Sequence, residues 1–189
     1  LTIDTHKGFP KGVWSLPKIQ KAHPHILFVP RNRKKEDNWS SDKYRTMTIN
    51  ALDDLVAELN DNPNIIPDVR GVYKVLFKGK SPSFLEHGTC GRFKDREPNV
   101  PISTLKENWV NGAETIYIGK AGSLTGNATL RKRIKQYLKI GQGKKVGHWG
   151  GRYIWQLKDS EKLAFCWCET PNDEPGDIET KLIQDFKDK

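Results

Sequence analysis

The segment Thr115-Ile116-Tyr117-Ile118-Gly119-Lys120-Ala121, followed closely by Leu130-Arg131-Lys132-Arg133-Ile134-Lys135-Gln136-Tyr137, decides the fold of this chain. Its first half is rich in β-branched and aromatic residues, which favour a strand. In its second half, apolar residues recur three and four positions apart between mostly basic positions, which is typical of a helix with one buried face. Gly126 and Asn127 precede this helix, and Gly141 and Gly143 end it. The segment therefore predicts a strand that leads into a basic amphipathic helix.

Outside this segment, the sequence predicts further helices and strands. Upstream, apolar residues at helical spacing indicate a helix over residues 49–59, and the composition of residues 71–77 is typical of a strand. Downstream, alternating apolar residues predict two strands over residues 153–157 and 163–167, joined by a turn. A last helix is expected to begin near Asp177. The first 47 residues show no regular pattern.

Together these elements predict an α+β fold, in which a small, mainly antiparallel sheet is flanked by helices. The polar stretch over residues 79–114 is too long for an ordinary loop, so we expect an insertion with some structure of its own between the first two strands. The chain is accordingly divided into an N-terminal extension with one helix, residues 1–69, and a domain that contains the insertion, residues 70–189.

The positive charge of the chain is concentrated in one region. The 189 residues include 32 basic and 23 acidic side chains, for a net charge of +9. Between Lys120 and Lys158 there are ten lysines and arginines and no acidic residue. Such a block is typical of a surface that binds nucleic-acid phosphates, although a solvated basic face has the same composition. The residues expected to contact nucleic acid are Lys132, Lys135, Lys139, Lys144, Lys145, His148 and Arg152.

Composition also excludes several classes of protein. Hydrophobic residues make up 35% of the chain and aromatic residues 10%, which argues against general disorder. The apolar runs are far shorter than the roughly 20 residues that cross a bilayer, so no membrane span is predicted. Cys90, Cys166 and Cys168 are an odd number without a repeated spacing, which argues against a disulfide framework. A reducing, cytoplasmic location is therefore expected.

Two charged residues on helices are candidates for chemistry. Glu179 lies on or beside the apolar face that continues to Phe186, where a carboxylate must be protonated, paired with a cation or bound to a metal. A salt bridge at the edge of this face is the plainer interpretation. Arg133 shares a helix face with Tyr137, and its plainer role is to cover apolar surface with its aliphatic stem.

The order of these motifs resembles that of the GIY-YIG nucleases. The matching segments are Gly71-Val72-Tyr73, Tyr117-Ile118-Gly119-Lys120-Ala121, the basic helix through Tyr137, and Glu179-Thr180-Lys181-Leu182-Ile183. They cover the chain from about residue 70 to residue 189. The chain is similar to stand-alone bacterial members, including restriction enzymes, and to the catalytic module of the excision-repair nuclease. The insertion departs from the family, which usually joins the first two motifs by a short hairpin.

The resemblance implies a metal-dependent DNA endonuclease that hydrolyses phosphodiester bonds. Tyr117, assisted by Tyr73, would act as the general base toward the attacking water. Lys120 would supply the nearby cation that a phenol, with an ordinary pKa of about 10, needs for this role. Arg133 would stabilise the charge that develops on the phosphate, and Tyr137 would orient the phosphate or the water.

The same resemblance implies that Glu179 holds one divalent metal, Mg²⁺ or Mn²⁺. Double-stranded DNA is the expected partner. The oligomeric state is open, and a homodimer is one option. Two alternatives are open: a non-catalytic nucleic-acid-binding protein on the same scaffold, and a nuclease that acts on RNA or branched DNA. The presence of both tyrosines, Arg133 and Glu179 favours catalysis. His148 lies in a glycine-rich turn and is as well explained by a structural role as by a contact with DNA.

Overall fold

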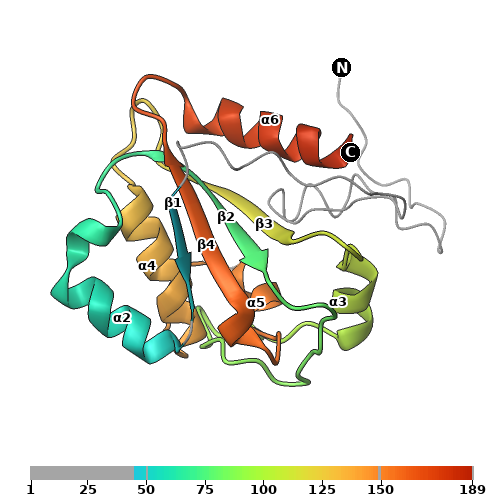
Figure 1. Ribbon diagram of the computed structural model, residues 1–189. Coiled ribbons are helices and arrows are strands. Elements are labelled where there is room, and N and C mark those ends of the chain that lie inside the picture. The colour runs from blue at the N-terminus through green and yellow to red at the C-terminus, as the bar shows by residue number, and fades with distance from the viewer. Residues whose placement is uncertain (1–44, 50, 149, 189) are drawn as a thin grey trace, which may run out of the picture.

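The computed structural model describes residues 45–49, 51–148 and 150–188 as one α+β unit built on an antiparallel sheet (Figure 1). The sheet has four strands in the order β1-β4-β2-β3, and all neighbouring strands are antiparallel. The strands are β1 (Arg45–Thr48), β2 (Gly71–Phe77), β3 (Thr115–Ala121) and β4 (Leu163–Glu169). In the described part of the chain, β1 and β3 are the edges of the sheet.

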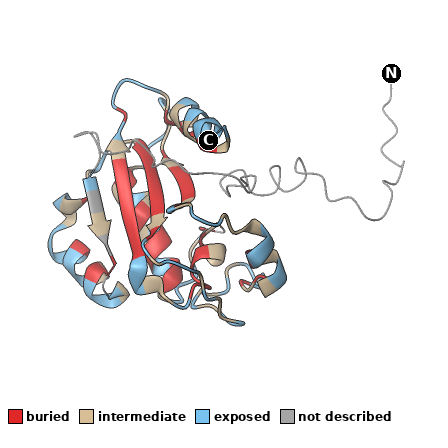
Figure 2. Cartoon of the chain, turned by 45° about the vertical axis from the view of Figure 1, so that its right-hand side comes forward, coloured by how far each residue is buried: buried red, intermediate tan, exposed pale blue. Residues whose placement is uncertain are grey.

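Helices cover the sheet on both faces. The elements are α2 (Leu52–Asp61), η1 (Pro63–Ile65), α3 (Ile102–Asn108), α4 (Leu130–Gly141), α5 (Gly151–Ile154), η2 (Ser160–Lys162) and α6 (Pro175–Lys187). Tyr73 and Tyr117 lie on the face that packs against α4 and belong to the main core. Ile118 lies on the opposite face and packs against Phe186 of α6. Figure 2 shows the buried strands between these layers.

Most of the predicted elements are confirmed, and their ends have clear physical causes. The helix expected over 49–59 is α2, and the strand expected over 71–77 is β2. The basic helix is α4, which begins after Thr129 because the Thr129 side chain accepts a hydrogen bond from the Lys132 N–H at 3.3 Å. The predicted strand over 163–167 is β4, and the last helix is α6.

Two local predictions are wrong. Residues 153–157 do not form a strand, because Gly151–Ile154 form the short helix α5. The turn of helix places the Trp155 ring against α4, where its Nε1–H donates to the Tyr137 carbonyl at 2.9 Å. The strand β1 lies within the region expected to be irregular, and it forms by pairing with β4. Residues 1–44 of the predicted extension lie outside the described residues.

The boundary expected after residue 69 does not separate two cores. Leu55 and Leu59 of α2, with Ile66 after η1, belong to the same buried cluster as Tyr73 and Phe165 of the sheet. Figure 1 shows α2 beside α4, away from the edge strand β3. The described residues 45–69 are therefore part of the same unit as the sheet.

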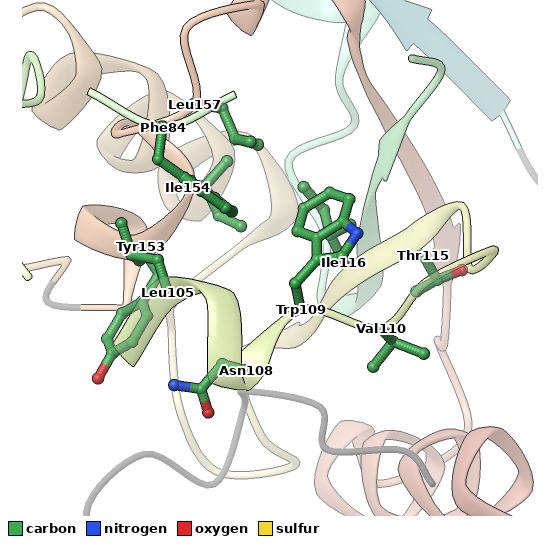
Figure 3. Close-up of a pocket in the computed structure, with 10 residues that line it drawn as sticks. All are labelled: Phe84, Leu105, Asn108, Trp109, Val110, Thr115, Ile116, Tyr153, Ile154 and Leu157. Carbon is green, nitrogen blue, oxygen red and sulfur yellow. The ribbon is translucent and has the colours of Figure 1, made fainter. Parts of the chain in front are cut away.

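The insertion between β2 and β3 leaves the two strands paired, with one shift of register between Val75 and Leu76, and it is fixed to the body by Gln156. This side chain is 1% exposed. Its Oε1 accepts the Val100 N–H at 2.6 Å, and its Nε2 donates to the carbonyls of Leu85 and Val100, each at 3.0 Å. Figure 3 shows the adjoining small pocket of about 40 Å³, where Trp109 of the insertion lies near Ile116. The expectation of an insertion with its own structure is confirmed by α3.

In the part of the chain that the structure describes, every helix is too short or too polar to cross a lipid bilayer.

Candidate active site

Glycine at position 119 makes room for two phenol rings over the sheet. Gly119 is directly opposite Tyr73 in the β2–β3 ladder. A Cβ atom at residue 119 would lie 2.7 Å from Tyr73 Cζ and 2.7 Å from Tyr117 Cε1. Cβ atoms in real proteins essentially never come this close to another heavy atom. Any other residue at position 119 would therefore displace the tyrosines.

Three buried tyrosines form the centre of the site, each from a different element. The ring centroids of Tyr73 on β2 and Tyr117 on β3 are 5.9 Å apart, and those of Tyr117 and Tyr137 on α4 are 5.3 Å apart. Burial raises the pKa of Tyr73 to about 12 and raises the pKa values of Tyr117 and Tyr137 well above the ordinary value. All three phenols are therefore neutral near pH 7, so they act as hydrogen-bonding groups and not as preformed phenolates.

The hydroxyl of Tyr73 is the point where the polar groups of the site meet. His148 Nε2 lies 3.1 Å from this oxygen. After the dominant effect of burial, the charge of Arg133 and hydrogen bonds with Tyr117 and Arg133 lower the pKa of Tyr73, and the charge of Glu179 raises it. The Tyr73 hydroxyl thus contacts His148 of the segment after α4, and its pKa responds to charges on α4 and α6.

An open pocket of about 440 Å³ lies beside these groups. It is lined by Tyr73, Tyr117, Lys120, Gly122, Ser123, Gly126, Asn127, Ala128 and Arg133. The loop between β3 and α4 forms one wall and is held by Glu174, whose Oε2 accepts the Leu124 N–H at 2.7 Å. Two cationic side chains, Lys120 and Arg133, therefore border the same opening as two phenols, an arrangement that suits an anionic group such as a phosphate.

Glu179 approaches the tyrosines from the other side of the edge strand. Its helix packs on Ile118, which faces away from Tyr117, and its side chain does not line the pocket. It is 6% exposed, and its charge acts on Tyr73. Lys120 also belongs by register to the α6 face, yet it lines the pocket and lies 4.0 Å from Glu174. The open edge of β3 thus lets residues of both faces approach one site.

The basic residues expected to contact nucleic acid divide into two groups. Lys132, Lys139, Lys144 and Lys145 are exposed. Lys135 is half-buried and donates to Asn60 Oδ1 of α2 at 3.2 Å, and Arg152 lies over the Tyr153 ring. These two side chains therefore have structural contacts as well as charge.

The assignment of His148 to the nucleic-acid-contacting residues is corrected by its burial. Its side chain is 1% exposed and contacts Tyr73, so it cannot lie on the surface that a duplex touches. The sequence showed only a glycine-rich turn at this position. The sequence analysis also missed Glu174, which accepts a hydrogen bond from the Leu124 backbone and lies near Lys120. The one available signal was its position immediately before Pro175, the first residue of α6.

The donor set for a metal consists of one carboxylate. No group of three or more histidine, cysteine, aspartate or glutamate side chains suited to a metal ion occurs among residues 45–49, 51–148 and 150–188. Mg²⁺ does not require such a cage, because it is commonly held by one or two carboxylates, water and the phosphates of the substrate. Glu179, which is buried and close enough for its charge to act on Tyr73, fits such a single-carboxylate site.

Comparison of the chain with protein-family models, with curated proteins and with solved structures finds no match.

Proposed function

We propose that this protein is a metal-dependent endonuclease of the GIY-YIG type that hydrolyses phosphodiester bonds in DNA. The observation that carries this proposal is the pocket at the edge of β3, where Tyr73, Tyr117, Lys120 and Arg133 meet although they come from three separate segments. Mere binding of nucleic acid needs cations on a surface. It does not need buried phenols at the floor of a cationic pocket or a buried carboxylate beside them.

The side chains of the pocket suggest how the reaction proceeds. Arg133 and Lys120 would neutralise the scissile phosphate, and Arg133 would stabilise the charge that develops as water attacks. Tyr117, a neutral phenol near pH 7 whose pKa burial raises further, would orient that water through its hydroxyl oxygen. A divalent cation held by Glu179 would supply Lewis-acid activation of the phosphate and acidify water.

The exposed lysines suggest where the duplex lies. Lys132 and Lys139 project from α4, and Lys144 and Lys145 follow its C-terminal end. Arg133, on the same helix, lines the pocket. A duplex that follows these cations would present a phosphate to the pocket, with a strongly salt-dependent affinity.

Cleavage of supercoiled plasmid tests the proposal. We expect nicked and linear products with Mg²⁺ or Mn²⁺ and intact plasmid with chelator. The reason is that the Glu179 carboxylate would assist cleavage only through the cation that it holds. Discrete fragments would indicate recognition of a sequence, as in a restriction enzyme. If DNA is bound but not cut with either metal, the chain is a binding protein. If only RNA or branched DNA is cut, the protein is a nuclease for that substrate and not for ordinary double-stranded DNA.

Replacing Lys144 and Lys145 with alanine should weaken DNA binding about equally for all sequences. The slope of log affinity against log salt should fall by about one for each phosphate that these lysines no longer neutralise. The matched control is Lys78→Ala with Lys162→Ala, which removes the same charge from lysines paired with Glu114 and Asp159, each at 3.0 Å. Fluorescence anisotropy at several salt concentrations measures both. An unchanged slope in the first variant would show that Lys144 and Lys145 do not contact DNA.

A further inference from the structure

His148 is built into the tyrosine cluster. It lies between α4 and α5, with its ring centroid 4.4 Å from that of Tyr137 and its Nε2 3.1 Å from the Tyr73 oxygen. Gly150, two residues later, lies against Tyr117, since a Cβ atom there would be 3.3 Å from the Tyr117 hydroxyl. The segment that carries His148 is therefore shaped around the tyrosines.

The hydrogen-bonding capacity of Tyr73 allows it to donate to His148. A tyrosine hydroxyl donates one hydrogen and accepts at its lone pairs. Arg133 can only donate, so toward Arg133 the Tyr73 oxygen is an acceptor. The Tyr73 hydrogen is then available to His148 Nε2, which lies 3.1 Å away. Donation to Nε2 requires an imidazole that has its proton on Nδ1.

We propose that His148 is a positioning residue of the nuclease site, whose Nε2 accepts the Tyr73 hydrogen and so holds the Tyr73 hydroxyl in one orientation. Because Tyr73 lines the pocket beside Tyr117, a fixed Tyr73 hydroxyl leaves its lone pairs in a set direction, where they help to align the attacking water. This inference rests on the proposed function. It assigns to His148 a role that no motif of the chain indicates.

The tautomer of His148 tests the hydrogen bond without any activity. In ¹⁵N NMR spectra of the metal-free protein, we expect an unprotonated, hydrogen-bonded Nε2 and a protonated Nδ1. The chain has five histidines, and the signal that disappears in His148→Gln is that of residue 148. In Tyr73→Phe the Nε2 shift should move toward that of a nitrogen without a donor. Protonated Nε2, or a shift that Tyr73→Phe leaves unchanged, would overturn the inference.

Cleavage kinetics test the consequence for catalysis. His148→Leu should lower kcat about 10- to 100-fold with KM unchanged, because it removes an orienting hydrogen bond and no contact with substrate. His148→Gln, whose Oε1 can accept the same hydrogen, should recover most of this loss. His87→Leu, in the exposed part of the insertion, is the matched control and should cleave normally.

A double-mutant cycle then separates positioning from general damage. In the Tyr73→Phe background, His148→Leu should cause little further loss of kcat, because its partner is already absent. Full additivity of the two losses, or a His148→Gln variant as slow as His148→Leu, would overturn the positioning role. A wild-type protein without nuclease activity would refute the proposed function instead, and the tautomer experiment would still decide the hydrogen bond.

Discussion

Replacing Glu179 with glutamine should reduce cleavage of DNA by about three orders of magnitude in the presence of Mg²⁺, since Lewis-acid activation by a metal contributes several kcal/mol at about tenfold per 1.4 kcal/mol. Glutamine keeps the shape of the side chain and removes the charge that would hold the cation. DNA binding should persist or tighten, because a negative charge near a phosphate-binding pocket has been removed. The two quantities are measured side by side, as single-turnover cleavage and as affinity in chelator.

The fold should survive this substitution. Glu179 is 6% exposed on a helix face that packs on the sheet, and a neutral amide costs less to bury than a carboxylate. Its charge also raises the pKa of Tyr73, so the pKa of Tyr73 should fall in the variant. The matched control is Asp185→Asn, an exposed carboxylate on the same helix. Full cleavage by Glu179→Gln would remove Glu179 from the metal site, and a parallel loss of folding would make it a structural residue.

The sequence predicted the parts of the fold that depend on local pattern. The helix α4 has a cap, a basic face and an apolar face, and β2 is rich in residues that favour strands, so both follow from local preference. Residues 153–157 alternate over too few positions to separate a strand from a short helix. Packing of Trp155 against α4 decided between them. β1 is only four residues long, and its pairing with β4 is a long-range contact that no local pattern encodes.

The candidate site shows a similar division. The family motifs placed Tyr73, Tyr117 and Arg133 together, and the structure brings these three to one pocket. The burial of the phenols was not foreseen, and it makes the base role harder, because the pKa of Tyr73 rises from the ordinary value of about 10 to about 12. His148 was missed as a partner of Tyr73 because its burial depends on how the segment after α4 folds back over the tyrosines.

Replacing Arg133 with methionine should lower kcat by about 100- to 1000-fold, the range for loss of one donor that stabilises charge in a transition state. Methionine keeps the apolar stem that covers the start of the pocket, so the packing of α4 should change little. The guanidinium also lowers the pKa of Tyr73, so its loss should raise that pKa further and weaken the hydrogen bond that Tyr73 donates to His148. Arg133→Lys, which keeps the charge without the planar set of donors, should recover only part of the activity.

Arg131 on the same helix provides the matched control for this experiment. Its Nε donates to the Ile66 carbonyl at 2.8 Å and its Nη2 to Asn64 at 3.1 Å, on the side of α4 that meets η1 and not the pocket. Arg131→Met removes the same charge from the same helix, so it should lower the free energy of unfolding by about 1 to 3 kcal/mol and leave kcat unchanged. If Arg133→Met raises KM with kcat unchanged, the guanidinium contributes only to binding of the substrate. Of the two arginines, Arg133 lines the pocket beside Tyr73 and Tyr117, and Arg131 does not. An equal loss of kcat in the two variants would therefore show that net charge, and not a contact in the pocket, explains the effect.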